Sequence, residues 1–179
     1  MAEHFIGKYE VEYKFRIQGH EQILQRLRSL GATEFVAQNQ ETDTYFDRAD
    51  SPLVEQGISM SVRSMEPSGI KLWIVKGPGN DRCEAVKIES VDKTHSMLKT
   101  LGYQAAFCMT KTRSIYFLGQ FHITLDRVSE LGDFAEIAVM TDDKHRLDEL
   151  KAGCLELGEK LGLEHSDIES RSYRQLLGY

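Results

Sequence analysis

The feature that most constrains the fold is an unbroken alternation in the stretch Tyr9–Ile17. Apolar or aromatic side chains occupy every second position from Tyr9, and charged side chains occupy the positions between them. Because successive side chains of a strand point to opposite faces, the pattern predicts a strand with one apolar and one charged face. An ordinary amphipathic strand at a protein surface would explain it equally well. Glu10 and Glu12 would lie about 7 Å apart on the charged face, a spacing that suits a hard cation.

Similar patterns recur along the whole chain. We expect further strands at 35–47, 58–64, 70–76, 82–89, 107–118, 121–128 and 133–140, most of them joined by tight turns. Apolar residues at helical spacing predict helices at 21–30, 91–101 and 142–161. This order of elements predicts an α+β fold in which surrounding helices decorate an eight-stranded antiparallel β-barrel or a curved sheet. The expected inner stripes are Val91, His95, Leu98 and Leu101 in the second helix, and Leu147, Leu150, Cys154, Leu157 and Leu161 in the third.

Length and composition exclude several classes of protein. The chain has 179 residues, which suits one domain over 1–179. A net charge of −6 argues against a nucleic-acid-coating surface. The three cysteines form no CxxC pair, so we expect neither a zinc site nor a disulfide framework, and a reducing, cytoplasmic location fits. The sequence contains no long apolar run, so we expect no membrane-spanning segment. The motifs of P-loop, Rossmann and GxSxG proteins are absent.

Charged residues interrupt nearly every predicted strand. A single charge on a strand is usually a surface or edge position, but that explanation weakens when almost every strand contributes one. If the charged faces line a barrel, the acids could bind Mg²⁺ or Mn²⁺ and the bases could bind phosphate oxygens. Together they suit a metal-bound polyphosphate. The acids are Glu10, Glu12, Asp43, Glu84, Asp126 and Glu136; the bases are Lys14, Arg16, Arg63, Lys76, Arg82, Lys87, Lys111 and Arg113.

The six histidines are scattered without the spacing of metal ligands. We therefore interpret them as surface or core residues. His122 fits this interpretation least well, because it shares a strand face with Asp126.

Several motifs resemble those of a known family. Residues 10–14 match the ExExK signature of the CYTH superfamily, the triphosphate tunnel metalloenzymes, and the charged strands follow in family order. Residues 4–12, 73–79, 132–137 and 172–178 closely resemble the bacterial class IV adenylyl cyclases of the CyaB type.

The resemblance implies conversion of ATP to 3′,5′-cyclic AMP and pyrophosphate inside the barrel, by a homodimer that uses two Mg²⁺ or Mn²⁺ ions. It implies metal ligation by Glu10, Glu12, Asp126 and Glu136. It implies substrate binding by Lys14, Arg63, Lys76, Lys87, Lys111 and Arg113, with Phe5 at the base. As catalytic residues we take Glu12, Glu136, Lys76, Lys111 and Arg113, which would activate the ribose 3′-oxygen and neutralise the leaving pyrophosphate.

Two other functions remain open at this point. Related tunnels resemble inorganic and thiamine triphosphatases, in which water attacks the γ-phosphorus, and a non-catalytic polyphosphate- or nucleotide-binding module would carry the same charges. The charges alone do not separate these alternatives. The lead-in and the tail of the chain favour the cyclase.

Overall fold

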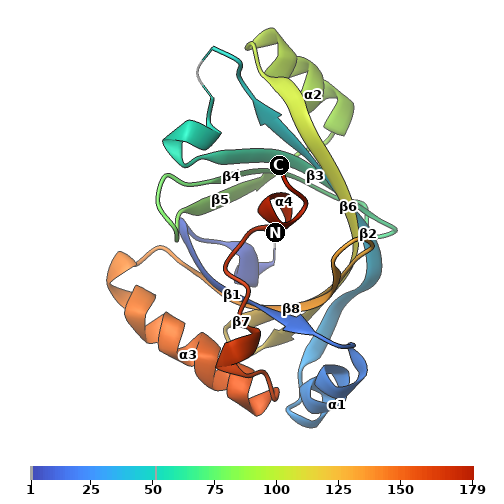
Figure 1. Ribbon diagram of the computed structural model, residues 1–179, viewed down its shortest axis with the longest axis vertical. Helices are drawn as coiled ribbons and strands as arrows, with labels where there is room; N and C mark the ends of the chain where they lie inside the picture. Colours follow the sequence, from blue (N-terminus) through green and yellow to red (C-terminus); the bar gives the residue numbers. More distant parts are fainter. Residues whose placement is uncertain (1, 51) are drawn as a thin grey trace.

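In a computed structural model, which describes residues 2–50 and 52–179, eight strands form one sheet that curls into a barrel (Figure 1). The strand order is β1-β8-β7-β6-β2-β3-β4-β5, and every pairing is antiparallel. The predicted fold class is therefore confirmed. The strands are β1 (Tyr9–Ile17), β2 (Thr33–Asp47), β3 (Ser59–Glu66), β4 (Ile70–Lys76), β5 (Cys83–Lys87), β6 (Gln104–Leu118), β7 (Phe121–Val128) and β8 (Gly132–Thr141).

The two edge strands, β1 and β5, meet at one end of the barrel. The amide of Glu10 donates to the carbonyl of Asp81 at 2.8 Å, and the amide of Cys83 donates to the carbonyl of Lys8 at 3.1 Å. Further along β1, the carbonyl of Lys14 instead accepts a hydrogen bond from the amide of Glu169, at 2.8 Å. The C-terminal segment therefore takes the place of β5 beside the far half of β1.

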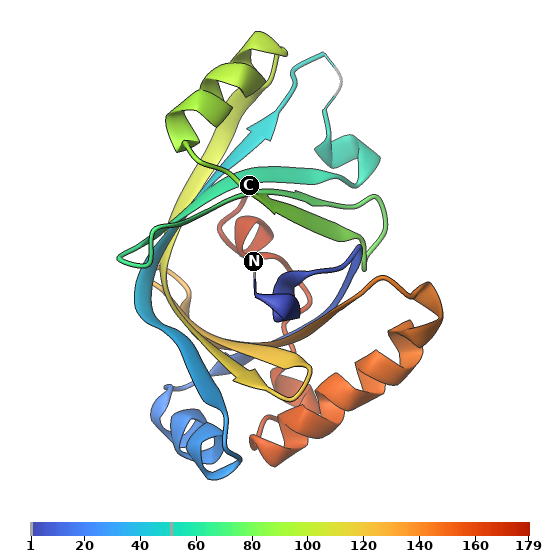
Figure 2. The ribbon, with the colours of Figure 1, turned by 180° about the vertical axis from the view of Figure 1, so that it is seen from behind.

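The helices occupy different positions relative to the barrel. Figure 1 shows α1 (Glu21–Ser29), α2 (Val91–Thr100) and α3 (Leu147–Lys160) outside the ring of strands, and α4 (Tyr173–Leu176) within its outline. The 3-10 helix η1 (Glu3–Phe5) lies at the opening seen from behind (Figure 2). Among the described residues, none of the helices is long and apolar enough to cross a membrane. The remaining short helices are η2 (Val54–Gln56), η3 (Lys144–Arg146) and η4 (His165–Asp167).

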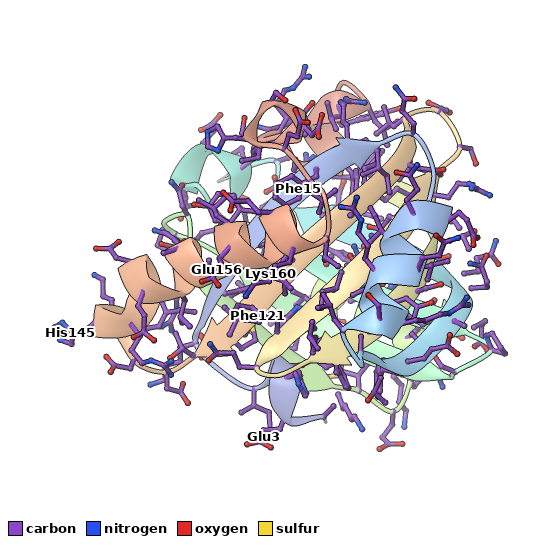
Figure 3. The ribbon with its side chains drawn as sticks, turned by 90° about the horizontal axis from the view of Figure 1, so that it is seen from below. Glu3, Phe15, Phe121, His145, Glu156 and Lys160 are labelled. Carbon is purple, nitrogen blue, oxygen red and sulfur yellow. The ribbon has the colours of Figure 1, made fainter. Side chains whose placement is uncertain are left out.

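The largest apolar core lies outside the barrel, between the sheet and α3 (Figure 3). The apolar face of β1 contributes Val11 and Phe15, which are fully or almost fully buried against it. Gly158 allows the close approach, because a Cβ there would lie 3.3 Å from the Phe15 ring. Since this face of β1 packs on the helix, its charged face must point into the barrel.

The predicted inner stripe of the third helix is confirmed, because all five of its residues are buried. The helix begins at Leu147 rather than at 142, however. The preceding turn forms η3, where the Asp143 carboxylate accepts a hydrogen bond from the His145 amide at 2.9 Å. The prediction for the second helix was wrong at Leu101, which is 63% exposed. That residue follows the last turn of α2, and Leu98 packs against the sheet instead.

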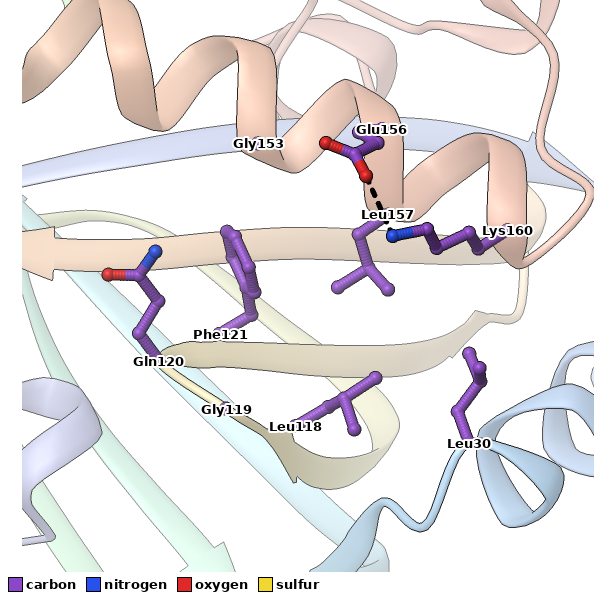
Figure 4. Close-up of a pocket in the computed structure, with 9 residues that line it drawn as sticks. All are labelled: Leu30, Leu118, Gly119, Gln120, Phe121, Gly153, Glu156, Leu157 and Lys160. Atoms are coloured by element: carbon purple, nitrogen blue, oxygen red, sulfur yellow. Dashed lines mark hydrogen bonds and ion pairs between the residues drawn. The ribbon is translucent and has the colours of Figure 1, made fainter.

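A groove lies on the outer side of the sheet, between α3 and the turn that joins β6 to β7 (Figure 4). Its lining includes Leu118, Phe121 and Leu157, and an ion pair of 2.7 Å between Glu156 and Lys160 borders it. Phe121 lies on the opposite face of β7 from His122 and Asp126, which point into the barrel. The groove is therefore separate from the charged interior.

The outer core should dominate stability. Leu150 is 1% exposed in this core, whereas Leu101 is 63% exposed. We expect Leu150→Ala to lower the free energy of unfolding by about 2–5 kcal/mol, because it leaves a cavity. The matched substitution Leu101→Ala should cost less than about 1 kcal/mol. Urea unfolding monitored by circular dichroism measures both, and equal losses would contradict this account of the core.

Candidate functional site

The charged faces of the strands meet inside the barrel, where several charged side chains are almost completely buried. The deepest group surrounds Arg113 of β6. Its Nε donates to Asp126 Oδ1 of the neighbouring β7 at 2.6 Å, and its Nη2 donates to Glu136 Oε2 of β8 at 2.6 Å. Burial disfavours the charged guanidinium, but these carboxylates and Glu41 together raise the pKa of Arg113 well above its usual value.

A second buried group joins β2, β3 and β6. Arg63 binds Asp43 in bidentate fashion, with distances of 2.7 and 2.9 Å. Glu41 Oε1 lies 3.0 Å from Arg63 Nη2 and 2.5 Å from Lys111 Nζ. Glu41 Oε2 is buried and has no hydrogen-bond partner among the described residues. The same Oε1 lies 3.7 Å from Arg113 Nη1, so Glu41 pairs with three bases of the interior through one of its two oxygens.

A third group, around Lys76, is more accessible to solvent. Its ammonium lies 2.9 Å from Glu10 and 3.5 Å from Glu12. The side chains of Lys76 and Glu12 are 48% and 32% exposed, whereas that of Lys111 is only 3% exposed. His122 Nε2 lies 3.6 Å from the other oxygen of Glu10. The interior thus has a closed part around Arg113 and an open part around Glu12.

The pKa values of two carboxylates diverge between these parts. Burial alone would raise the pKa of Glu136, but Arg113, Lys111 and other bases lower it to about 2. Burial also raises the pKa of Glu12; Lys76 offsets part of this rise, while Glu136 and Glu10 add to it. Burial raises the pKa of Asp126 as well, but Asp126 binds Arg113 at 2.6 Å. The ion-pair partner of Glu12 among the described residues is Lys76, at 3.5 Å. Glu12 is therefore the predicted metal ligand with the weakest ion pair.

The C-terminal segment lies at the closed part of the interior. Lys14 Nζ donates to the carbonyl of Arg171, and the Tyr173 hydroxyl donates to Asp126 Oδ2 at 2.8 Å. Glu169 anchors the segment, because its carboxylate binds Arg16 at 3.1 Å and Arg171 at 2.8 Å. Arg16, whose role the sequence left open, thus holds the tail in place.

The opposite opening is lined by aromatic rings around η1. The ring of Phe5 lies 4.8 Å from that of His122 and 5.6 Å from that of Phe117, between centroids. His4 stacks on Phe117 at 3.9 Å. Phe35 completes the group, 4.8 Å from Phe117. Flat apolar surface therefore gathers at the opening that faces away from the tail.

Most of the predicted site residues converge, with one exception. Lys87 lies at the end of β5 and is exposed, far along the strand from the inward-facing Cys83. Two interior residues were missed. Glu41 could have been found, since it lies two positions before Asp43 and so shares its face. Tyr173 gave no such signal, because its place inside the barrel depends on how the tail docks.

The donor set inside the barrel fits divalent cations in its chemistry. The inward charged groups carry a formal sum of −1, so a polyanionic ligand would need added positive charge. Oxygen ligands suit Mg²⁺ or Mn²⁺. Among the described residues, however, no three acidic, histidine or cysteine side chains lie close enough together to bind one metal ion. The groups are five bases, Lys14, Arg63, Lys76, Lys111 and Arg113, and six acids, Glu10, Glu12, Glu41, Asp43, Asp126 and Glu136.

A β-barrel with an ion-paired interior is the architecture of triphosphate tunnel proteins, and comparison with known proteins agrees with that class. The model of the CYTH domain matches residues 8–173, and the chain belongs to this family.

Near-full-length relatives narrow the resemblance. The chain is 46% identical over 175 residues to the adenylate cyclase CyaB of Aeromonas hydrophila, covering 98% of this chain and 92% of that one. It is 41% identical to a candidate adenylate cyclase from Vibrio parahaemolyticus, whose X-ray structure superposes with a TM-score of 0.93 over 97% of this chain and all (100%) of that one.

A more distant structure shares only the fold. A candidate adenylyl cyclase from Hippeastrum, described as having a dominant triphosphatase activity, is 13% identical with a TM-score of 0.64. The alignment covers 94% of each chain.

Two isosteric substitutions should separate the closed and open parts of the interior. Glu136→Gln removes a charge that Arg113 needs, so we expect the free energy of unfolding at pH 7 to fall by about 3 kcal/mol. Glu12→Gln removes a poorly compensated charge, so we expect an unchanged or slightly higher melting temperature. Thermal unfolding in the absence of divalent metal measures both. An equal loss in the two variants would contradict the division.

The dependence of stability on pH should follow the Glu136 pKa. Because this pKa is lowered from 4.5 to about 2 on folding, the ionised carboxylate stabilises the native state above pH 4.5. That contribution should be lost as the pH falls from about 4.5 toward 2. The free energy of unfolding of Glu136→Gln should therefore fall less steeply in this window than that of the parent. Parallel curves from urea titrations at several pH values would argue against the assignment.

Proposed function

We propose that the protein is an adenylyl cyclase that converts ATP to 3′,5′-cyclic AMP and pyrophosphate. The barrel interior carries this proposal, because its buried bases form ion pairs with carboxylates. Such bases are positioned to exchange a carboxylate for a phosphate oxygen of similar geometry. The near-full-length similarity to the Aeromonas adenylate cyclase supports the choice of ATP among possible triphosphates.

The triphosphate would bind to the inward bases. Arg63 and Arg113 offer planar forks that suit phosphate oxygens, and Lys14, Lys76 and Lys111 offer point charges. Lys14 now donates to a main-chain carbonyl of the tail, and that bond must yield when a phosphate oxygen arrives. Lys87 would contribute only where the substrate reaches the end of β5.

Phosphate binding would change the partners of the acids. When Arg113 turns from Glu136 to a phosphate oxygen, Glu136 is left with the Thr124 hydroxyl, 3.1 Å away. Glu136 would then join Glu12 and Glu10 as an oxygen ligand for a divalent cation. Asp126 is fully engaged by Arg113 and Tyr173, so we propose that it orients Arg113 and completes the ligand set only after this exchange.

Glu10, Glu12, Glu136 and Asp126 would hold two Mg²⁺ or Mn²⁺ ions. When bound, these ions neutralise phosphate charge and lower the pKa of a coordinated hydroxyl. The chain itself positions the reactants, and Lys76, Lys111 and Arg113 stabilise negative charge that develops on the leaving group.

In the reaction, the ribose 3′-oxygen bonds to the α-phosphorus and the bond from that phosphorus to the α–β bridging oxygen breaks. The 3′-hydroxyl proton is released, and pyrophosphate leaves with the bridging oxygen. Phe5 would contact the base at the aromatic opening.

Resemblance to class IV cyclases also supports a cytoplasmic homodimer. Light scattering after size-exclusion chromatography tests the dimer, and a monomer at micromolar concentration would exclude it.

One assay distinguishes the cyclase from its rivals. The protein is incubated with ATP or with tripolyphosphate plus Mg²⁺ or Mn²⁺, and products are separated by anion-exchange chromatography. We expect cyclic AMP and pyrophosphate from ATP. Release of orthophosphate from either substrate would indicate a triphosphatase, and the absence of any product would indicate a binding module.

Glu12 offers the sharpest test of mechanism, because its removal should not cost stability. We expect Glu12→Gln to lower kcat for cyclic AMP formation by about 100-fold or more, as for loss of a main electrostatic contact in the transition state. Glu156→Gln, which changes an exposed acid of α3 (Figure 3), serves as the control and should match the parent. Near-normal cyclic AMP production by Glu12→Gln would refute the assignment.

A further inference from the structure

His122 has a buried ring nitrogen that is paired with none of the described residues. The residue lies on the inner face of β7 and is 4% exposed. Its Nε2 faces Glu10 at 3.6 Å, but its Nδ1 has no hydrogen-bond partner among the described residues. Buried polar atoms are nearly always paired, and an unpaired one costs about 1–3 kcal/mol. Because this cost is avoided when Nδ1 is paired, we infer that a bound ligand supplies its hydrogen-bond partner.

The position of His122 indicates which part of a ligand that partner belongs to. On one side of its ring is Glu10, which also binds Lys76, the most exposed of the inward bases. On the other side is Phe5, whose ring centroid is 4.8 Å away. His122 therefore stands between the phosphate-binding bases and the aromatic opening. In a nucleoside triphosphate, the ribose connects the phosphates to the base.

We propose that His122 recognises the nucleoside part of the substrate, through a hydrogen bond between Nδ1 and a polar atom of the ribose other than the attacking 3′-hydroxyl, or of the adjoining base edge. The inference rests on the proposed function, in that the ligand is a nucleoside triphosphate. His122 would therefore strengthen the binding of ATP but not that of tripolyphosphate, which has no ribose or base to accept or donate this hydrogen bond. The bases deeper in the barrel bind both ligands alike.

The test compares the affinities of two ligands for the whole protein. Isothermal titration calorimetry with Mn²⁺ measures the binding of 3′-deoxy-ATP, which lacks the attacking hydroxyl, and of tripolyphosphate. We expect His122→Phe to weaken 3′-deoxy-ATP binding about tenfold, equivalent to about 1.4 kcal/mol, and to change tripolyphosphate binding less than about twofold. The phenyl ring keeps the packing against Phe5.

Two further variants make the test specific to the hydrogen bond. His122→Asn places an amide close to the position of Nδ1, so it should restore most of the affinity for 3′-deoxy-ATP. His145→Phe makes the same change at an exposed histidine of η3, which projects from the molecule (Figure 3), and should bind both ligands as the parent does.

Each other outcome overturns the inference. An equal loss for both ligands would mean that His122 acts only by holding Glu10 beside Lys76. A failure of Asn to rescue would mean that only the ring packing matters, and an unchanged affinity would mean that Nδ1 meets no ligand. Failure of the proposed function is seen separately: a parent that makes no cyclic AMP, yet binds 3′-deoxy-ATP through His122, would lose the cyclase assignment and keep this one.

Discussion

Mutual neutralisation of buried charges inside the barrel is the interaction on which the rest of the structure depends. Transfer of one ion from water into a protein costs several kcal/mol even after relaxation. Arg113 is tolerated because Asp126 and Glu136 lie within 2.6 Å of its nitrogens. The charged part of the interior cannot also serve as the hydrophobic core. The largest core therefore forms on the outside of the sheet, where Val11 and Phe15 pack under α3. A smaller apolar cluster lies on the inward faces beside the tail, where Phe134 packs against Tyr173.

This arrangement explains why the helices are where they are. An outward-facing apolar sheet surface needs a cover, and α3 supplies one with five buried residues along a single stripe. The smaller cluster around Phe46 and Met60 is covered by α2. The two faces of these strands thus have different roles. The outer face packs against a helix, and the inner face presents charged side chains to the interior.

The alternation of residues made most of this fold predictable. The bounds of β4 and β7 agree with those expected from sequence, because Gly69 and Gly77-Pro78 flank β4 and the turn at Gly119 precedes β7. Local pattern failed where tertiary contacts decide. Leu101 fits the helical period, but the helix ends before it and leaves it exposed. The pairing of Glu41 with Arg63 and Lys111 depends on register between three strands, which alternation alone does not determine.

The two ends of the barrel differ in a way that gives the interior a direction. At one end the tail covers Lys14 and inserts Tyr173, so the deepest charges are reached only by displacing main-chain and side-chain contacts. At the other end Glu12 and Lys76 remain accessible, and aromatic rings border the opening. A ligand with a highly charged end and a flat apolar end would enter with its charge toward Arg113 and leave its rings beside Phe5. That orientation would bring the junction between the two ends to Glu10 and Glu12. Lys76 and His122 compensate the negative charge of Glu10, whereas that of Glu12 is compensated less.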